Sequence, residues 1–569
     1  MNSHGRWQLI LLIALAAALT LGTSGWGDLY NETDGQYGGA AKVMVRTGSW
    51  LIPENDGIPR LVKPPLLYWV LAASMKIFGV NEFAARLPNA LAVTFWVGVT
   101  FLIGAKMGGT WRGFLAGIIL LTSLGTFTLG RIVMPEPMFS AFIAAALYCA
   151  LRGADHAPHS SGWFFGFWLF AAMASFTKGW HGLLYPLAIV GMAAILCRQA
   201  RTRLRGLVSW QGALLFTIIN LPWYLYVEFR FPGYLHNLLV AEQLGHVAGA
   251  LTPATSYTDV PRWQFLLLQL AWLFPWSLAF IAATPLIAIH FRRQRYVEPS
   301  FPALIVIVWM AVIAGSVLLT GQRQDYYAMS MWPAFALAVA WTLERSRVQP
   351  AIVLLAILLG AGLAGLAWSH AIPYFTHASS TTAALAERAT AWTTIINFDR
   401  AVWTSLRTTA WFALGTALLF ALIGLSSRPS KLKLAAIAAS AICLDLGAVS
   451  GTSSVSPYFS LATVAGDIHR DAPIVYDGGI DTGSSLLFYS DSPVILLDQN
   501  PDKDFIVRKF GIGRDRFLTI SEFVAFWNSA APTVLITEES RLADWRKILG
   551  ISLAPVARCG TQILLKKTP

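Results

Sequence analysis

Long apolar runs, separated by short polar loops, fill the chain from its N-terminal end to about residue 450. A helix that spans a lipid bilayer needs about 20 mostly apolar residues. By this criterion the sequence predicts about thirteen spans, at approximately residues 7–25, 84–105, 110–129, 133–152, 162–177, 180–197, 207–227, 263–290, 301–320, 327–344, 350–370, 409–426 and 432–450. The pattern therefore predicts a mainly α-helical, polytopic membrane protein.

The composition supports this prediction. Hydrophobic residues make up 56% of the 569 residues and charged residues only 13%, with a mean hydropathy of +0.56. A water-facing surface on a chain of this size needs more charge than that. The first apolar run follows Arg6 as a signal peptide would, but no small-x-small site followed by a soluble domain comes after it. We therefore expect an uncleaved first span.

Basic residues occur in every second loop, which predicts the orientation. These loops carry Lys106 and Arg112; Arg152; Arg198, Arg201, Arg203 and Arg205; Arg292, Arg293 and Arg295; Arg345 and Arg347; and Arg428, Lys431 and Lys433. Because positive loops stay on the cytoplasmic side, we expect a cytoplasmic N-terminus, and an odd number of spans then places the C-terminal segment outside. The net charge of +12 is thereby explained by topology, and no nucleic-acid partner is expected.

The chain after about residue 450 has the composition of a soluble domain. Short apolar strands at Ala472–Tyr476, Val494–Leu497, Thr533–Thr537 and Gln562–Leu565 alternate with helical patterns around Leu461–Arg470 and Ile520–Ala530. Turn signals between them indicate a small α/β domain. We therefore predict a transmembrane domain over residues 1–450 and an extracytoplasmic α/β domain over residues 451–569, to which we assign a supporting role.

The first polar interval, residues 26–83, is the candidate catalytic loop on the outer side. Glu32 and Asp34 lie two residues apart just beyond the first apolar run. A desolvated carboxylate at that position can act as a general base that deprotonates an acceptor hydroxyl. The alternative is an ordinary solvated loop with an Asx-type turn before Gly35.

Cations and aromatic residues collect on the same predicted side. Lys63, Lys178, Arg131 and Arg323 could together form a cradle for a phosphate or pyrophosphate, although each alone could be an interfacial anchor. Glu136, between two prolines at the top of a span, is costly near apolar sequence unless it is functional or paired, for example with Arg131. Tyr326 and Tyr327 could contact a sugar or a lipid headgroup, or belong to an aromatic belt.

Several other kinds of site are not indicated. The four cysteines show no CxxC spacing, and His181, His236 and His246 show no helical two-His spacing, so no metal site is predicted. A glycine-rich nucleotide motif after a strand is also absent from the sequence, which argues against an ATPase or a nucleotide-sugar donor. No cofactor is evident.

The order of these features resembles a known family, the aminoarabinose-transferase-like C-type glycosyltransferases, which are related to the protein mannosyltransferases. The resemblance rests on the paired acids followed by Tyr37, on Gly48-Ser49-Trp50-Leu51-Ile52-Pro53, and on Lys63-Pro64-Pro65-Leu66-Leu67-Tyr68-Trp69. Further matches are Phe83–Pro88, Thr177–Gly179, Pro222–Tyr224, Pro232-Gly233 with Glu242-Gln243, and Arg323 with Tyr326-Tyr327 before Pro333. The similarity spans essentially the whole chain.

This resemblance implies a sugar donor linked to a polyprenyl phosphate and a lipid or protein acceptor on the periplasmic face. It makes an acid of the first loop the catalytic base, for which we prefer Asp34 over Glu32, and makes Glu136 a second acid of the site. Lys63, Lys178 and Arg323 would hold the donor phosphate, with Arg131 nearby, while Tyr37, Tyr326, Tyr327 and Glu242 would contact substrates.

The sequence departs from the family pattern in two places. The family has an adjacent Asp-Glu ahead of Arg-Tyr, where this chain has Glu32-Thr33-Asp34 ahead of Gln36-Tyr37. The usual acid-His pair of the fourth outer loop is Glu242-Gln243 here, so any role that needs that histidine is lost. Both departures bear on the sugar and the acceptor more than on the reaction class.

The predicted function is that of a bacterial inner-membrane glycosyltransferase, which moves a sugar from undecaprenyl phosphate to lipid A or another acceptor. A transporter or flippase of lipid-linked sugars is the alternative, but it predicts internal repeats and several ionisable residues within spans. We find no evident repeat, and Asp445 is the main mid-span charge. A non-catalytic envelope scaffold would not need the acids and cations of the outer loops.

Overall fold

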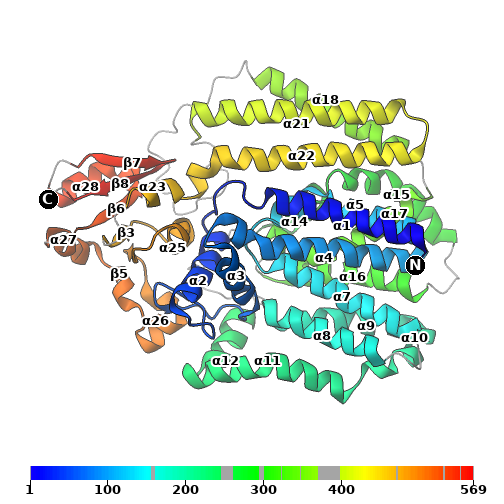
Figure 1. Cartoon of the computed structure of the whole chain (residues 1–569), viewed down its shortest axis with the longest axis horizontal. Coiled ribbons are helices and arrows are strands. Elements are labelled where there is room, and N and C mark those ends of the chain that lie inside the picture. The colour runs from blue at the N-terminus through cyan, green and yellow to red at the C-terminus, as the bar shows by residue number, and fades with distance from the viewer. Residues whose placement is uncertain are drawn as a thin grey trace.

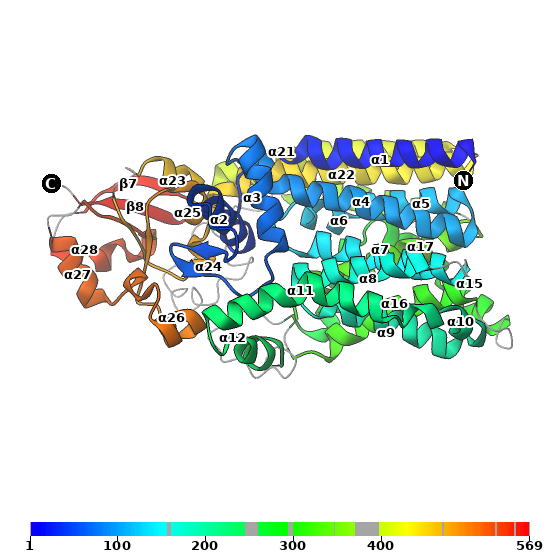
Figure 2. The same ribbon diagram turned by 60° about the horizontal axis from the view of Figure 1, so that its bottom comes forward.

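A bundle of helices and a smaller α/β part make up the computed structural model (Figure 1). The structure describes residues 2–155, 161–244, 260–293, 300–321, 323–345, 348–369, 398–468, 472–529, 532–550 and 553–567. The N-terminus lies at the end of the bundle opposite the α/β part (Figures 1 and 2). The assignment of these two ends to the cytoplasm and the outside remains a prediction.

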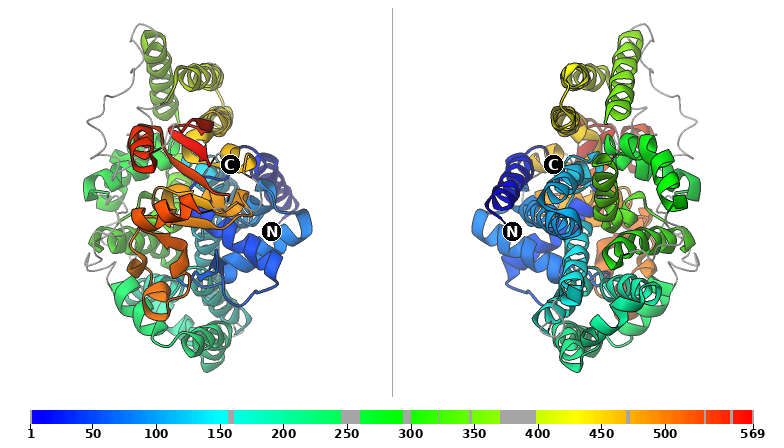
Figure 3. Two further views of the ribbon diagram at one scale, coloured as in Figure 1. Left: turned by 90° about the vertical axis from the view of Figure 1, so that its left-hand side faces the viewer. Right: turned by 90° about the vertical axis from the view of Figure 1, so that its right-hand side faces the viewer.

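The bundle helices follow one another through most of the chain. They are α1 (Ser3–Thr23), α4 (Glu82–Gly108), α5 (Thr110–Leu121), α6 (Leu124–Leu129), α7 (Glu136–Asp155), α8 (Ser161–Lys178), α9 (His181–Leu196), α10 (Arg198–Arg203), α11 (Trp210–Arg230), α14 (Arg262–Trp272), α15 (Trp276–Arg293), α16 (Phe301–Leu319), α17 (Trp332–Leu343), α18 (Gln349–Ser369), α21 (Arg400–Ser426) and α22 (Ser430–Phe459). α18, α21 and α22 form a layer on one side of the bundle (Figures 1 and 3).

Within the described ranges, eight helices are long and apolar enough to cross a membrane, or up to nine if the bent pair α14 and α15 is one span. The prediction of a multi-span membrane protein is therefore confirmed, whereas the number thirteen remains a prediction. Three shorter apolar helices, Leu66–Phe78, Thr110–Leu121 and His181–Leu196, fall below the length criterion.

Two of the predicted continuous runs are interrupted. The run at 110–129 divides into α5 and α6, because the hydroxyls of Thr122 and Ser123 donate back to the preceding turn and the Leu124 N–H donates to the carbonyl of Phe274 at 3.0 Å. The run at 263–290 bends by 112° between α14 and α15. Local apolar content does not reveal such breaks, because the interrupted segments remain apolar throughout.

Small residues allow the bundle helices to approach closely. A Cβ atom on Gly113 of α5 would lie 2.4 Å from the carbonyl oxygen of Phe101 in α4. Close backbone approach at small residues is typical of helix packing in membranes. Larger side chains fill the interior between other helices, where the rings of Trp96 and Trp332 stack at 6.3 Å.

The first polar interval folds into two helices, α2 (Thr33–Thr47) and α3 (Leu66–Phe78), with the short hairpin β1 (Glu54–Asn55) and β2 (Ile58–Pro59) between them. α3 begins at Leu66, directly after Pro64-Pro65, in keeping with the preference of proline for the start of a helix. α2 lies between α3 and the α/β part (Figure 2).

The α/β part contains one six-stranded sheet with the order β5-β4-β3-β6-β8-β7. Its strands are β3 (Ile474–Tyr476), β4 (Val494–Leu497), β5 (Phe517–Leu518), β6 (Val534–Glu538), β7 (Pro555–Cys559) and β8 (Gln562–Lys566). The first four strands in the sheet order run parallel to one another. β8 runs antiparallel to both of its neighbours, β6 and β7. Strands occur at all four predicted positions, while β5 and β7 were missed because one is only two residues long and the other is a partly exposed edge strand.

Helices cover this sheet and connect it to the bundle. They are α23 (Ala462–Gly466), α24 (Ile480–Gly483), α25 (Ser485–Tyr489), α26 (Phe505–Phe510), α27 (Ile520–Asn528) and α28 (Leu542–Leu549). The predicted boundary between residues 450 and 451 lies within α22, which continues to Phe459. The division into residues 1–450 and 451–569 therefore remains a prediction.

Candidate active site

Asp34, at the start of α2, is buried and fully engaged by the backbone. Its side chain is 2% exposed, its Oδ1 accepts the Val133 N–H at 2.6 Å, and its Oδ2 accepts the Tyr30 N–H at 3.0 Å. Burial raises the pKa of the Asp34 carboxyl above its ordinary value, and nearby Arg86, the two N–H donors and Arg131 partly oppose this shift. Through the hydrogen bond to Val133, Asp34 holds the first loop against the segment between α6 and α7.

Glu32 has a different environment. Its backbone has a φ of 65°, a conformation that non-glycine residues seldom adopt. Its N–H donates to the carbonyl of Asp481 at 2.9 Å and its carbonyl accepts the Ser484 hydroxyl at 3.1 Å. Within the described part of the chain no group donates a hydrogen bond to its side-chain carboxylate. The residue is exposed, yet the partial loss of solvent around its carboxyl raises the pKa of Glu32, and the charges of Asp481 and Asp325 raise it further.

The α/β part holds this acidic segment in place. The Asn31 Oδ1 accepts both the N–H of Ser485 at 3.0 Å and its hydroxyl at 2.7 Å. The side-chain amide of Gln36 donates to Asp481 Oδ1 at 2.6 Å. A Cβ atom on Gly35 would lie 2.3 Å from the backbone of Ser484, so this contact requires glycine. α24 and α25 therefore determine where Glu32 lies.

Glu136 and Lys178 form an ion pair at 2.9 Å between the start of α7 and the end of α8. The Lys178 Nζ also lies 5.0 Å from the ring centroid of Tyr327, within the range of a cation–π contact. The structure pairs Glu136 with Lys178 and not with Arg131, so the alternative partner considered from the sequence is wrong. Lys178 is partly exposed, and its role in binding a donor phosphate remains a prediction.

Arg131 instead binds the C-terminal end of α1 together with Arg86. Arg131 donates to the carbonyls of Thr23 and Trp26, the latter at 2.8 Å. Arg86 donates to four carbonyls, those of Ser24, Trp26, Gly27 and Asp28, at 2.5–3.2 Å. Cations at a helix C-terminus offset its unpaired carbonyls. Arg131 is thus occupied with α1, and its role in donor binding remains a prediction.

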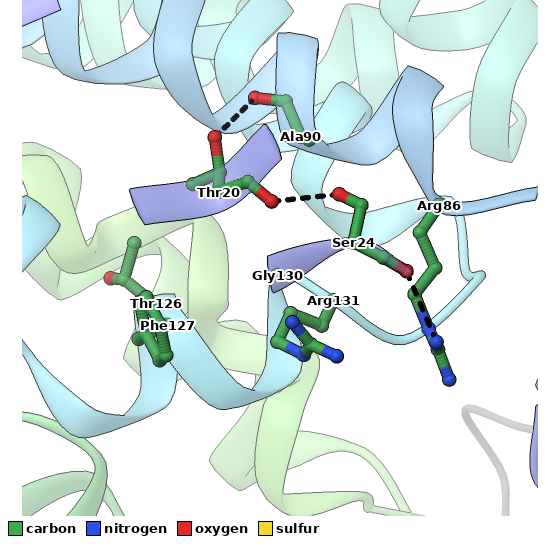
Figure 4. Close-up of a pocket in the computed structure, with 8 residues that line it drawn as sticks. All are labelled: Thr20, Ser24, Arg86, Ala90, Thr126, Phe127, Gly130 and Arg131. Atoms are coloured by element: carbon green, nitrogen blue, oxygen red, sulfur yellow. Dashed lines mark hydrogen bonds between the residues drawn. The ribbon is translucent and has the colours of Figure 1, made fainter. Parts of the chain in front are cut away.

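A cavity of about 10 Å³ lies beside these arginines, room for roughly one water molecule. Its lining residues are Thr20, Ser24, Arg86, Ala90, Thr126, Phe127, Gly130 and Arg131 (Figure 4). The cavity is too small for a sugar or a lipid phosphate, so it belongs to the support of the first loop.

The remaining predicted residues lie around the 3₁₀ helix η3 (Asp325–Met331) and in the first loop. Arg323 is buried and its Nε donates to the carbonyl of Val260 at 3.0 Å. The rings of Tyr326 and Tyr327 meet edge to face at 5.3 Å. Lys63 is partly buried before α3.

Tyr37 and Glu242 complete the predicted set. Tyr37 is 4% exposed and packs against Tyr68, with ring centroids 5.0 Å apart. It therefore belongs to the core of the first loop, and direct substrate contact by its ring remains a prediction. Glu242 lies on the π-helix η2 (Asn237–Leu244), and its side chain lies outside the described part of the structure.

Sequence reasoning missed three residues that the structure places at this site. Asp325 lies between the predicted Arg323 and Tyr326, and Arg86 lies within the family match Phe83–Pro88, so both had a local signal. Asp481 had none, because it comes from the α/β part and reaches Glu32 across 449 positions of the chain (481 − 32).

The chain is similar to several known proteins. Residues 7–238 match the family model of dolichyl-phosphate-mannose-protein mannosyltransferases. The undecaprenyl phosphate-α-4-amino-4-deoxy-L-arabinose arabinosyl transferase of Yersinia enterocolitica is 25% identical over 354 residues, covering 60% of each chain. The transferase of the same name from Shewanella sediminis is 26% identical over 296 residues, covering 52% of this chain and 53% of its own.

The crystal structure of ArnT from Cupriavidus metallidurans bound to undecaprenyl phosphate matches with a TM-score of 0.80 and 18% identity, covering 100% of this chain and 99% of that one. The curated relatives are matched over 53–60% of their own lengths. The resemblance to aminoarabinose transferases and protein mannosyltransferases is thereby confirmed, and the chain has the polytopic C-type glycosyltransferase fold of ArnT, with a mannosyltransferase-family match over residues 7–238.

Proposed function

We propose that this protein is an integral-membrane glycosyltransferase. It would transfer a sugar from a polyprenyl-phosphate-linked donor to a lipid A-like or other acceptor at the periplasmic face of a bacterial inner membrane. The similarity to undecaprenyl phosphate-α-4-amino-4-deoxy-L-arabinose arabinosyl transferases supports this substrate class. So does the undecaprenyl phosphate bound to the structural neighbour.

The observation that carries the proposal is the carboxylate of Glu32, to which no described residue donates a hydrogen bond, in a loop that packs on the helical bundle through Asp34 and Val133. Glu32 is near enough to Asp325 for the two charges to interact. Asp325 begins η3, and Tyr327 of the same helix contacts Lys178. η3 therefore links Asp325, whose charge acts on Glu32, with Tyr327, which contacts Lys178, the cation that we propose binds phosphate.

In the proposed reaction, Glu32 accepts the proton of the acceptor hydroxyl. The acceptor oxygen forms a bond to the anomeric carbon of the sugar, and the bond from that carbon to the phosphate oxygen breaks. The polyprenyl phosphate leaves with the electron pair, and Lys178, with Lys63 and Arg323, would stabilise its charge. The raised pKa of the Glu32 carboxyl makes its carboxylate a stronger base than that of a glutamate with the ordinary pKa.

Asp34 has another part in this proposal. The sequence favoured Asp34 as the base, but both of its oxygens accept backbone N–H groups. We therefore assign proton transfer to Glu32 and the positioning of the loop to Asp34. Glu136 would hold Lys178 until a donor phosphate takes its place.

The test uses purified full-length protein with undecaprenyl phosphate-α-4-amino-4-deoxy-L-arabinose as donor and lipid A as acceptor. We expect Glu32→Gln to lower kcat by about 10²–10⁴-fold, with unchanged donor binding and thermal stability. Asp34→Asn should lower thermal stability as well as activity, because an amide replaces one of the two acceptors. An active Glu32→Gln enzyme beside a stable, inactive Asp34→Asn enzyme would transfer the role of base to Asp34.

A further inference from the structure

We propose that a cavity around Asp445, inside the helical bundle, is a binding site for a small amphiphile with one aliphatic chain and a protonated primary amine. This site is separate from the first loop, and the proposal does not depend on the transferase activity. It rests on an apolar cavity of sufficient size and on a buried carboxylate without a partner.

The cavity has a volume of about 320 Å³, within the usual range of about 300–1,000 Å³ for small-molecule sites. By its lining residues, it lies where α6, the bend between α14 and α15, and the helices α18, α21 and α22 meet. Its lining residues are Leu124, Phe274, Pro275, Leu358, Leu359, Leu414, Ala441, Leu444 and Asp445. Asp445 is thus the one charged side chain in an otherwise apolar lining.

Asp445 is 2% exposed and lies midway along the 30-residue helix α22. No residue in the described ranges donates a hydrogen bond to its carboxylate or forms an ion pair with it. Other buried carboxylates of this chain have such partners: Asp34 has two N–H donors, Glu136 has Lys178, and Asp477 has Trp545 and Thr537. A buried carboxylate inside a membrane bundle is costly unless it is paired or functional.

The polar groups at the bend are already satisfied. The Phe274 carbonyl accepts the Leu124 N–H at 3.0 Å, and the indole N–H of Trp276 donates to the Thr122 hydroxyl at 2.9 Å. The Ser440 hydroxyl, one turn before Asp445, donates to the Ala417 carbonyl at 2.7 Å. Among the described residues that line the cavity, Asp445 is the one whose side chain needs a hydrogen-bond donor.

The cavity can be reached from the apolar side of the bundle. Leu358 of α18 is 44% exposed and Leu414 of α21 is partly exposed, so the wall that they form reaches the outer surface of the helices. A ligand that is dissolved in the lipid phase could therefore enter between α18 and α21.

The lining determines the chemical class of ligand. The cavity of about 320 Å³ is far larger than the space that one water molecule needs, and it has room for a chain of several methylene groups. A carboxylate in apolar surroundings is stabilised by an adjacent cation with hydrogen-bond donors. A protonated primary amine on an aliphatic chain supplies both the charge and the apolar contact.

The test measures equilibrium binding of radiolabelled decylamine to the full-length protein in nanodiscs. We expect saturable binding with about one site per chain. Asp445→Asn, which keeps the size but removes the charge, should weaken it at least about tenfold, a difference of about 1.4 kcal/mol. Asp544→Asn, which removes an exposed acid of α28, is the matched control and should bind like the wild type. Decanol should displace decylamine only weakly, and to the same extent from Asp445→Asn and from Asp544→Asn.

A second variant separates ligand binding from a purely structural role. Ala441→Phe should fill the cavity and abolish decylamine binding without removing the acid. Asp445→Asn should unfold at the same temperature as the wild type or a higher one, because an unpaired buried charge is removed. The proposal would be overturned by non-saturable binding, by equal binding to Asp445→Asn, or by an Asp445→Asn protein that is less stable than the wild type.

Discussion

Glu32 and Asp34 are two residues apart, yet their side chains meet different surroundings. Asp34 accepts two backbone N–H groups, whereas Glu32 faces Asp481 and Asp325. Their separation in the sequence shows only that both cannot lie on the same face of a helix. The sequence could therefore predict that Glu32 and Asp34 belong to the site. Which of them is the base and which positions the loop depends on partners that come from distant segments.

A third acid of the first loop, Asp56, should make stability depend on pH. Its Oδ2 accepts the Val494 N–H at 3.0 Å, and burial raises its pKa from 3.8 to about 6 despite the charges of Arg516 and Lys42. The folded protein therefore binds a proton more tightly here than the unfolded chain. This group's contribution is fully present below about pH 4 and is lost as the pH rises to about 6.

The measurement is the thermal unfolding of wild type and Asp56→Asn in detergent between pH 4 and pH 7. Relative to the variant, the wild type should lose stability as the pH rises through this range. A difference between the two proteins that is constant with pH would contradict the raised pKa.

At the scale of elements, the close contact between α2 and α25 decides the position of the acidic segment. Lys42 of α2 is buried and donates to the carbonyls of Phe488 and Ser490 at 2.8 and 2.5 Å, while its Nζ lies 3.0 Å from Asp491. Gly35 provides the space for the contact. The start of α3 could be predicted because two prolines define it locally, but the partner of α2 could not.

Gly35→Ala should separate α2 from α25. The new methyl group would lie 2.3 Å from the backbone of Ser484, and such overpacking typically costs about 1–3 kcal/mol. We expect lower thermal stability and a fall in kcat, because Glu32 moves away from Asp481. Gly22→Ala is the control, since nothing lies within 4 Å of its Cβ position, and it should leave both unchanged. A stable and fully active Gly35→Ala protein would show that α25 does not position Glu32.

At the scale of the whole molecule, the orientation can be tested by cysteine labelling in intact spheroplasts. Alternation of basic loops predicts a cytoplasmic N-terminus and an external α/β part. In a background with Cys443→Ala, Lys503→Cys should react with an impermeant maleimide, whereas Ser3→Cys should react only after permeabilisation. The opposite pattern would invert the proposed topology and move the candidate site to the cytoplasmic face.

The sequence by itself determined the multi-span helical class, the start of α3, and four strands of the α/β part. These features depend on residue types that lie within a few positions of one another, such as an apolar run, a pair of prolines or a short β-rich segment. Only the tertiary structure decided that Asp34 binds Val133, that Glu136 pairs with Lys178, and that Asp445 has no partner among the described residues. The free energy of a buried charge depends on which groups surround it in space, and contacts between distant segments leave no local pattern in the chain.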